Sequence, residues 1–154
     1  MQVPKVKSFL FQVLALAVLA ATPAHAAITI EIVDPVIVAR IDKSSQSMKV
    51  SIDGEQLYSW KVSTGARGYA TPVGDYAPYR MHTMWRSREY DDAPMPHAVF
   101  FYEGYAVHGT TSTGNLGRRA SHGCIRLHPK NAKKFFDLVL QHGRARTKIT
   151  ITGD

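Results

Sequence analysis

A cysteine and a histidine sixteen residues before it have the types and the spacing of a nucleophile and its base. Cys124 lies within Ser-His-Gly-Cys-Ile-Arg-Leu (121–127) and is the single cysteine of the chain. A lone cysteine is usually a small buried hydrophobe, but His122, Gly123 and Arg126 surround this one. Because the thiolate is the reactive form and nearby positive charge lowers the pKa of a thiol, we expect Cys124 to be a nucleophile with a lowered pKa.

Two histidines are candidates for the base that a cysteine nucleophile needs. His108 follows the apolar run 105–107 and precedes Gly109, whereas His122 is two residues before the cysteine. A histidine at the end of a strand, facing a loop that returns beside it, can reach a thiol. Spacing alone does not choose between the two. A backbone N–H near Gly123 is a candidate for stabilising an oxyanion, and the missing Cβ allows the backbone to approach a substrate closely.

The elements that must position these residues are mostly strands. Strands are predicted over 36–41, 98–102, 105–107 and 148–152, and a hairpin over 48–62 with its turn at Asp53-Gly54. One helix is predicted over 129–141, because Pro129 suits a first turn and Gly143 ends the apolar period. The glycine-rich stretch 110–121 is predicted to be a loop with exposed arginines at 118 and 119. We therefore expect a β-rich α+β domain.

Segment 78–96 has no clear period and contains prolines, so we predict a long surface loop that could serve as a functional lid. Trp85 and Tyr90 lie within it, and His97 follows it. Each of the two aromatic residues has two interpretations, contact with a substrate or packing of the loop onto the domain. His97 is placed as a residue that lines the cleft.

Residues 1–26 have the pattern of a secretory signal peptide. Lysines at 5 and 7 precede an apolar run over 9–21, and Ala-His-Ala at 24–26 is a small-x-small cleavage site. The run is shorter than the roughly 20 apolar residues that span a bilayer, so an uncleaved anchor is the weaker alternative. Cleavage removes two lysines and no acid, which lowers the formal charge from +7 to +5. We expect an exported protein with no membrane segment after cleavage, for which nucleic acid is not a partner.

The residues around His108 and Cys124 resemble the signature of the L,D-transpeptidase catalytic domain family. That signature is a histidine, about sixteen residues, then Ser-His-Gly-Cys, a small apolar residue and Arg. Thr-Pro-Val-Gly at 71–74 and the early strand-turn-strand with Gln46 also resemble this family. The likeness covers about 36–152, nearly all of the chain after the signal peptide and a short lead-in (27–35). It implies a β-sandwich with one main helix after the cysteine, forming a catalytic domain over 36–154.

The resemblance implies an enzyme that acts on peptidoglycan stem peptides. Cys124 would attack the carbonyl of residue three of a tetrapeptide stem, usually diaminopimelate, and release D-Ala from a thioester acyl-enzyme. An amine of a second stem would then take the acyl group and form a 3→3 cross-link. His108 matches the base of the family and the Gly109 carbonyl matches the group that orients it. His122 and Gly123 match the oxyanion segment.

Ser121 and Arg126 match residues that shape the site of the family. Arg126 has two open interpretations, a bidentate contact with a substrate carboxylate or a structural tie of the loop. The resemblance implies no cofactor and no metal, a periplasmic or cell-wall location, and acylation of Cys124 by carbapenems.

The acyl acceptor stays open at this level. It could be a stem amine, an amine of a lipoprotein or outer-membrane protein, a free D-amino acid, or water in a hydrolase of the same family. A non-catalytic wall-binding module is the alternative from a different class, but it would not explain the His108 and Cys124 pair. A zinc hydrolase is disfavoured because no His-Glu-x-x-His motif occurs in the sequence.

Overall fold

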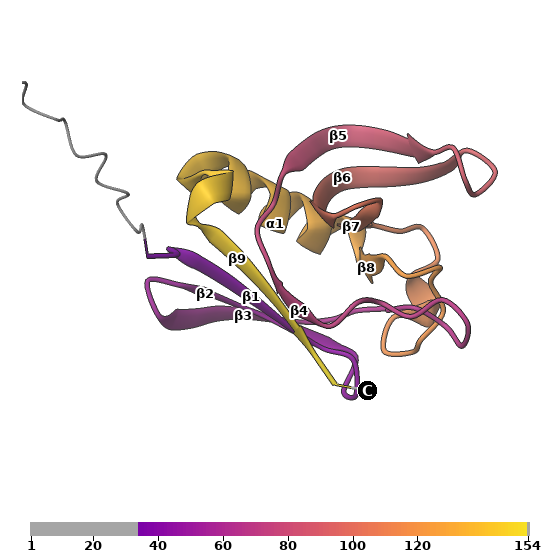
Figure 1. The fold of residues 1–154 in the computed structure, drawn as a ribbon, viewed down its shortest axis with the longest axis horizontal. Helices are drawn as coiled ribbons and strands as arrows, with labels where there is room; N and C mark the ends of the chain where they lie inside the picture. The colour runs from indigo at the N-terminus through magenta and orange to yellow at the C-terminus, as the bar shows by residue number, and fades with distance from the viewer. Residues whose placement is uncertain (1–33, 154) are drawn as a thin grey trace, which may run out of the picture. The chain divides into compact units, whose positions relative to one another are not determined.

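The computed structural model describes residues 34–153, and in this part of the chain nine strands form two sheets with one α-helix (Figure 1). The first sheet has the strand order β3-β2-β1-β9-β4, and the second has the order β5-β6-β7-β8. The elements are β1 (Ile37–Asp42), β2 (Ser47–Ile52), β3 (Glu55–Lys61), β4 (Gly74–Tyr76), β5 (Arg80–Ser87), β6 (Ala93–Tyr102), β7 (Tyr105–Gly109), β8 (Ile125–Leu127), α1 (Pro129–His142) and β9 (Thr147–Thr152), with 3-10 turns at Thr113–Asn115 and Arg144–Arg146. The predicted mainly β fold, with its main helix after the cysteine, is confirmed. The predicted signal peptide and most of the lead-in lie outside the described residues.

The first sheet contains the predicted hairpin. β2 and β3 pair antiparallel, and Asp53 and Gly54 between them have φ angles of 49° and 84°, as a type I′ turn requires. β1 lies at the centre of the sheet, where it pairs antiparallel with β2 and parallel with β9. The last strand of the chain, β9, therefore lies inside the first sheet, between β1 and β4.

The second sheet corrects the prediction for segment 78–96, which is not a long loop. β5 pairs antiparallel with β6 from Arg80 opposite Phe100 to Ser87 opposite Ala93. The two prolines of β6, at 94 and 96, lie in a part of the strand that β7 does not reach, because β7 pairs with β6 only from Val99 onward. Proline is tolerated where its missing N–H has no partner strand. The segment is thus a β-hairpin with a short turn over 88–92.

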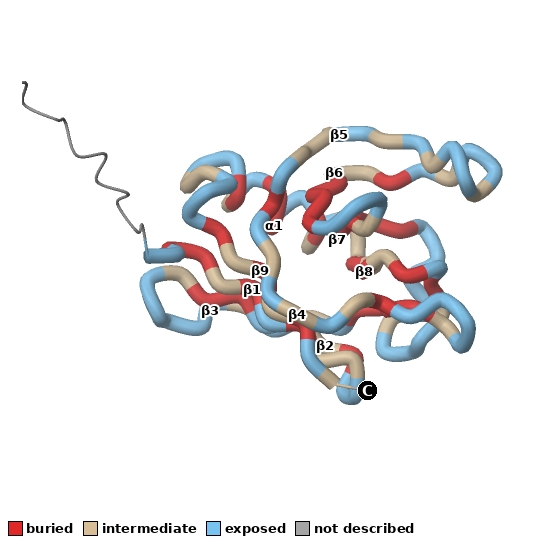
Figure 2. Tube along the Cα trace, viewed as in Figure 1, coloured by how far each residue is buried: buried red, intermediate tan, exposed pale blue. Residues whose placement is uncertain are grey.

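Helix α1 covers one face of the second sheet. It packs against β6 and β7, and Phe135 and Val139 are buried in a core that includes Val99 and Val107 (Figure 2). Burial of each such side chain contributes about 1.5–3 kcal/mol. The helix begins after His128, whose Nδ1 accepts the Lys130 N–H, and ends where the Gly143 N–H donates to the Val139 carbonyl. Within residues 34–153 no helix is long and apolar enough to span a bilayer.

The other face of the second sheet carries a separate small cluster. Alternation along the strands turns Phe100 and Ala106 away from the main core, and they pack with Met95 and Ala98. Trp85 and Cys124 lie against this second cluster. A strand with one buried residue on each face must keep its register, since a shift of one residue would exchange the two faces. The fold thereby holds the cysteine over a rigid apolar floor.

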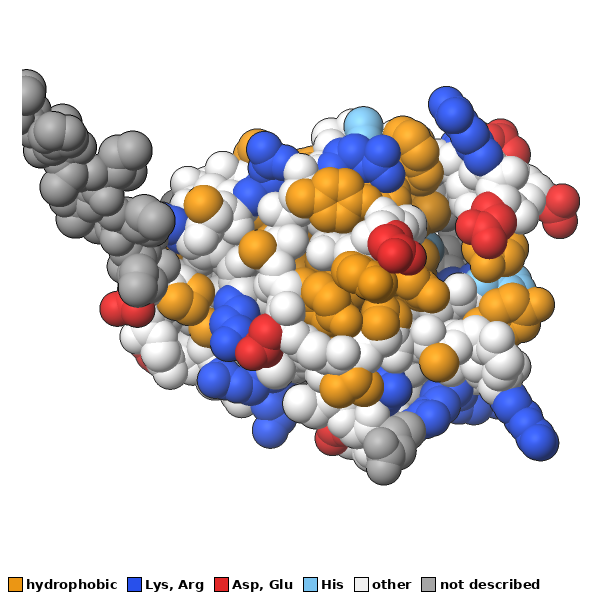
Figure 3. Space-filling model, viewed as in Figure 1, with side chains coloured by type: hydrophobic (Ala, Val, Ile, Leu, Met, Phe, Trp, Pro, Cys, Tyr) orange, Lys and Arg blue, Asp and Glu red, His pale blue; other side chains and the backbone are white. Residues whose placement is uncertain are grey.

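Basic side chains do not form one stripe on the face shown in Figure 3. Lysine and arginine side chains are spread over this face, with acidic side chains between them. A protein that binds nucleic acid usually gathers these charges along one surface. The charge pattern of this face gives no support to a nucleic-acid partner.

Candidate active site

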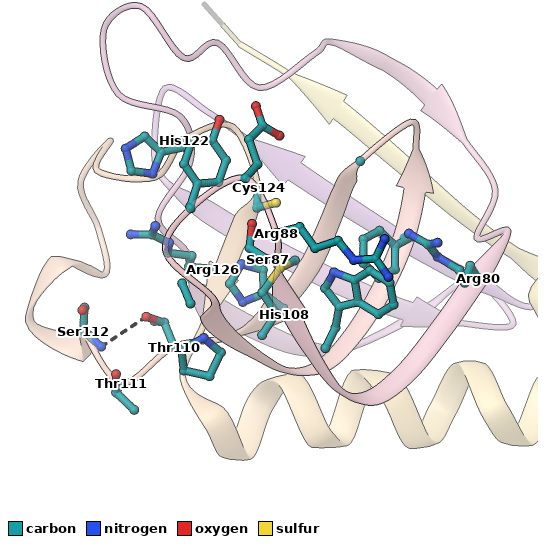
Figure 4. A pocket seen from close by; sticks show the side chains of 18 residues that line it. Arg80, Ser87, Arg88, His108, Thr110, Thr111, Ser112, His122, Cys124 and Arg126 are labelled. Carbon is teal, nitrogen blue, oxygen red and sulfur yellow. Dashed lines mark hydrogen bonds between the residues drawn. The ribbon is translucent and has the colours of Figure 1, made fainter.

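A pocket of about 320 Å³ opens over the second cluster, and Cys124 and His108 both line it (Figure 4). Four further residues named from the sequence line it as well, Trp85, Tyr90, His122 and Arg126. The remaining lining residues are Arg80, Ser87, Arg88, Glu89, Ala93, Pro94, Met95, Phe100, Gly104, Thr110, Thr111 and Ser112. The β5–β6 hairpin therefore forms one wall, while β7, β8 and the loops beside them form the other.

Cys124 lies directly before β8, with its side chain partly exposed to the pocket. Burial raises the pKa of the Cys124 thiol, and this is the largest effect on it. A hydrogen bond from the Ala106 backbone and the positive charge of Arg126 act in the opposite direction, while Glu89 adds to the increase. The expectation of a lowered thiol pKa is therefore wrong, because burial outweighs the nearby positive charge. The resting group is a neutral thiol.

His108 is almost fully buried, with 5% of its surface exposed, on the strand next to the cysteine. Its Nδ1 lies 2.7 Å from the Gly109 carbonyl oxygen. A carbonyl oxygen can only accept, so Nδ1 carries the proton and Nε2 keeps a lone pair. Burial, as the largest effect, lowers the pKa of His108 from 6.5 to about 4, although the Gly109 bond acts to raise it. His108 is thus a neutral imidazole of fixed tautomer at neutral pH.

The loop before the cysteine is held by its own hydrogen bonds. Ser121 Oγ accepts the Gly123 N–H at 3.0 Å and donates to the Cys124 carbonyl at 2.6 Å. Gly123 has φ +110°, and a Cβ there would overlap Cε1 of Tyr105, so only glycine fits without strain. Because the Gly123 N–H donates to Ser121 Oγ, it is not free to bind an oxyanion. The Cys124 N–H, by contrast, has no acceptor among residues 34–153 and is the N–H that could meet an oxyanion.

A buried threonine ties this loop to the rest of the domain. Thr71 Oγ1 donates to the Gly123 carbonyl at 2.7 Å and accepts the Gly65 N–H at 2.9 Å. Gln46 fixes the neighbouring strand end, since its Nε2 donates to Thr64 Oγ1 at 2.6 Å and its Oε1 accepts the Thr64 N–H at 2.9 Å. Gln46 and Thr71 therefore support the backbone around the cysteine.

The sequence profile of the YkuD family, described as the L,D-transpeptidase catalytic domain, matches residues 36–151. The chain belongs to this family. It is a family of cysteine transpeptidases, and the observed fold agrees with it.

Individual relatives are similar to this chain over parts of their length. Probable L,D-transpeptidase YbiS of Escherichia coli (strain K12) is 41% identical over 49 residues, which make up 31% of this chain and 16% of that protein. An L,D-transpeptidase structure from Stackebrandtia nassauensis is 24% identical, with a TM-score of 0.70 over 80% of this chain and 58% of that one. The structure of LdtMt1 in complex with imipenem is 25% identical, with a TM-score of 0.66 over 76% of this chain and 59% of that one. The chain spans less than two thirds of each of these relatives.

Arg126 stands beside His108 in this L,D-transpeptidase domain, because the two are paired across β7 and β8. Its Nη1 donates to the Ala120 carbonyl at 3.2 Å, and its side chain also lines the pocket. The tie to the loop is therefore present, and the pocket contact leaves the second interpretation possible for the same residue. The Arg126 charge lowers the pKa of both His108 and Cys124.

The turn of the β5–β6 hairpin reaches across the pocket to the cysteine loop. The Tyr90 ring stacks on the exposed His122 ring with centroids 4.4 Å apart and an angle of 9°. Tyr69 meets the same imidazole edge-on at 4.6 Å. An ion pair of 3.3 Å between Arg86 and Asp92 closes the base of the turn. The hairpin is thus a lid docked on His122, which packs between two tyrosines and lacks the buried, oriented position of His108.

Of Trp85 and His97, which were both expected near the cleft, only Trp85 lines the pocket. Trp85 lies within the pocket and packs against Phe100 at 5.6 Å. His97 does not line the pocket, because its ring packs against Phe136 of α1 at 5.6 Å. The His97 ring thus lies on the helix side of the sheet, the side to which Val99 and Phe101 of the same strand also turn. The structure therefore brings Trp85, but not His97, to the cysteine.

Sequence reasoning missed the charged residues that the hairpin adds to the pocket, namely Arg80, Arg88 and Glu89. The charged run over 86–92 is the signal that contains Arg88 and Glu89, whereas no local pattern marks Arg80. No group of three His, Cys, Asp or Glu side chains within residues 34–153 is arranged to hold a metal ion. The chemistry available to the described pocket is that of a thiol, an imidazole and charged side chains.

Proposed function

We propose that the domain is a peptidoglycan L,D-transpeptidase that transfers an acyl group from a tetrapeptide stem through Cys124. The observation that carries this proposal is the pair of neutral groups in one pocket, a thiol and a buried imidazole whose Nε2 is unprotonated. Such a pair can exchange a proton with a substrate without first separating charge in a buried site. His108, held by Gly109, is the base of this proposal.

In the first half-reaction Cys124 Sγ attacks the carbonyl carbon of residue three of the stem. His108 Nε2 takes the thiol proton as the S–C bond forms, and the Cys124 N–H stabilises the resulting oxyanion. The imidazolium then donates that proton to the departing amine as the C–N bond breaks. The products are a thioester on Cys124 and free D-Ala.

In the second half-reaction an amine attacks the thioester carbonyl and gives a proton to His108. The new C–N bond forms, the C–S bond breaks, and the proton returns to the Cys124 sulfur. A stem amine as acceptor gives a 3→3 cross-link. Water would give a hydrolase, and an amine of a lipoprotein or outer-membrane protein would give protein attachment.

Two consequences follow for location and inhibition. A substrate in the cell wall places the domain outside the cytoplasm, which agrees with the signal peptide predicted over 1–26. The complex of LdtMt1 with imipenem suggests that this chain, like its relative, binds a carbapenem. We propose that the carbapenem acylates Cys124.

The test incubates the purified protein with a disaccharide-tetrapeptide and follows the products by mass spectrometry. The expected result is a thioester on Cys124, release of D-Ala and a 3→3 dimer. Cys124→Ala should give none of these, and turnover by that variant would overturn the proposal. Tripeptide without dimer would assign the protein as a hydrolase instead. Imipenem should add its mass to the wild type and not to Cys124→Ala.

A further inference from the structure

Arg80 lies at the end of the pocket that β5 and β6 form, and its guanidinium packs against two aromatic rings. The guanidinium carbon is 4.1 Å from the centroid of Phe100 and 4.7 Å from the Trp85 ring. The Trp85 and Phe100 rings are nearly perpendicular, at 81°, so the cation lies in the corner between them and its position is fixed by both. Figure 4 shows the side chain directed from β5 toward the interior of the pocket.

The donors of this fixed guanidinium are not used by the described part of the protein. Arg80 Nε is buried without a hydrogen-bond partner, and within residues 34–153 no carboxylate forms an ion pair with it. A buried donor without an acceptor destabilises the protein, more so when the group is charged. Packing on the rings accounts for the orientation of Arg80 but leaves its hydrogen-bonding capacity unfilled.

The surrounding charge is positive as well. Arg88 and Arg126 also line the pocket, and the one acidic residue among its lining residues is Glu89. Figure 4 shows Arg88 extending from the hairpin turn toward the end of the pocket where Arg80 lies. Positive side chains that line one partly enclosed site favour an anion in it. A carboxylate fits best, because a planar guanidinium can bind it through two parallel hydrogen bonds.

We propose that Arg80 binds a carboxylate of the donor stem peptide and thereby selects substrates that carry it. This inference rests on the proposed function, since it takes the stem peptide as the substrate. A tetrapeptide stem offers three carboxylates, those of D-isoglutamate, of the diaminopimelate side chain and of the terminal D-Ala. Arg80 acts on binding and orientation and takes no part in proton transfer, which belongs to His108.

The experiment measures kcat/KM for the free tetrapeptide and for three forms of it, each with one carboxylate converted to an amide. Wild-type protein should prefer the free peptide over one of the amides by about 10- to 100-fold. Arg80→Gln should lose most of that preference, because it converts the free peptide about as slowly as the amide. Arg80→Lys keeps the charge without the planar fork and should retain only part of it. The amide that the wild type rejects identifies the carboxylate.

Arg40→Gln is the matched control, because Arg40 is an exposed arginine of β1 in the other sheet. It removes the same charge and should leave the preference unchanged, and a thermal melt of each variant shows that it is folded. Equal rates for all four peptides in the wild type, or an unchanged preference in Arg80→Gln, would overturn the role of Arg80 while the proposed function stands. Failure of the wild type on every peptide, with imipenem still adding to Cys124, would overturn the proposed function and this inference together.

Discussion

The stability of the protein at acidic pH should depend on the imidazole of His108. Its pKa is lowered from 6.5 to about 4 in the folded protein, so the unfolded chain binds a proton first as the pH falls. The resulting stabilisation is complete above about pH 6.5 and is lost as the pH falls toward about 4. The difference between the two pKa values corresponds to about 3 kcal/mol.

The informative substitution is His108→Asn. The asparagine amide can take the position of the Nδ1–H opposite the Gly109 carbonyl, so the buried hydrogen bond is kept while the titrating group is removed. Urea unfolding, followed by tryptophan fluorescence, gives the free energy of unfolding of each protein at about pH 7 and about pH 4.5. Between these two values the wild type should lose about 2 kcal/mol more than His108→Asn.

The comparison is internal, because each protein is measured against itself at the two pH values. Equal losses in the two proteins would refute the reasoning that burial holds His108 neutral. Kinetics provide a second readout, since the acid limb of kcat/KM reports the base of the free enzyme. That limb should lie near pH 4 in the wild type, and a limb near pH 6.5 would likewise contradict the lowered pKa.

Three further substitutions test other parts of the site. Glu89→Gln removes a charge that raises the pKa of the Cys124 thiol, so iodoacetamide should alkylate Cys124 faster at neutral pH; an unchanged rate would contradict this effect. Thr71→Val leaves the buried Gly123 carbonyl and the Gly65 N–H without their partner, so the free energy of unfolding should fall by about 2–4 kcal/mol. A fall of less than about 0.5 kcal/mol would contradict a stabilising role of Thr71. Gly123→Ala forces a Cβ against the Tyr105 ring at a positive φ, so acylation by imipenem should slow at least about tenfold, and wild-type acylation would show that the loop adapts.

Local signals in the sequence predicted the parts of the fold that depend on neighbouring residues. The Asp53-Gly54 turn was predictable because both residues tolerate positive φ, and α1 because Pro129 and Gly143 mark its ends. The β5–β6 hairpin was not predictable from local signals. The alternation of buried and exposed residues in β5 breaks at Thr83 and Met84, and β6 contains prolines. What makes this segment a hairpin is pairing along its whole length, which no short window contains.

The same division applies to the candidate site. The spacing of His108 and Cys124 predicts a pair, and the structure places both in one pocket. The pKa of Cys124 was predicted in the wrong direction, because the neighbours in sequence include Arg126 but not the cluster of β6 and β7 that buries the thiol. Arg80 escaped notice for a related reason, since its stacking partner Phe100 is twenty residues away and meets it only across the paired strands.

A neutral thiol suits a nucleophile in the proposed location outside the cytoplasm. Reactivity toward oxidants follows thiolate character and exposure, and this chain has no second cysteine to form a protective disulfide. Burial holds Cys124 in the thiol form, while Tyr90 docks the lid against His122 beside it. His108 Nε2 stays unprotonated because the same burial disfavours the imidazolium. A substrate that fills the pocket and places its carbonyl carbon at the sulfur supplies what the resting pair lacks, an electrophile and an oxyanion for the Cys124 N–H. The burial that makes the resting cysteine slow to react with oxidants therefore also directs its reactivity to a bound acyl donor.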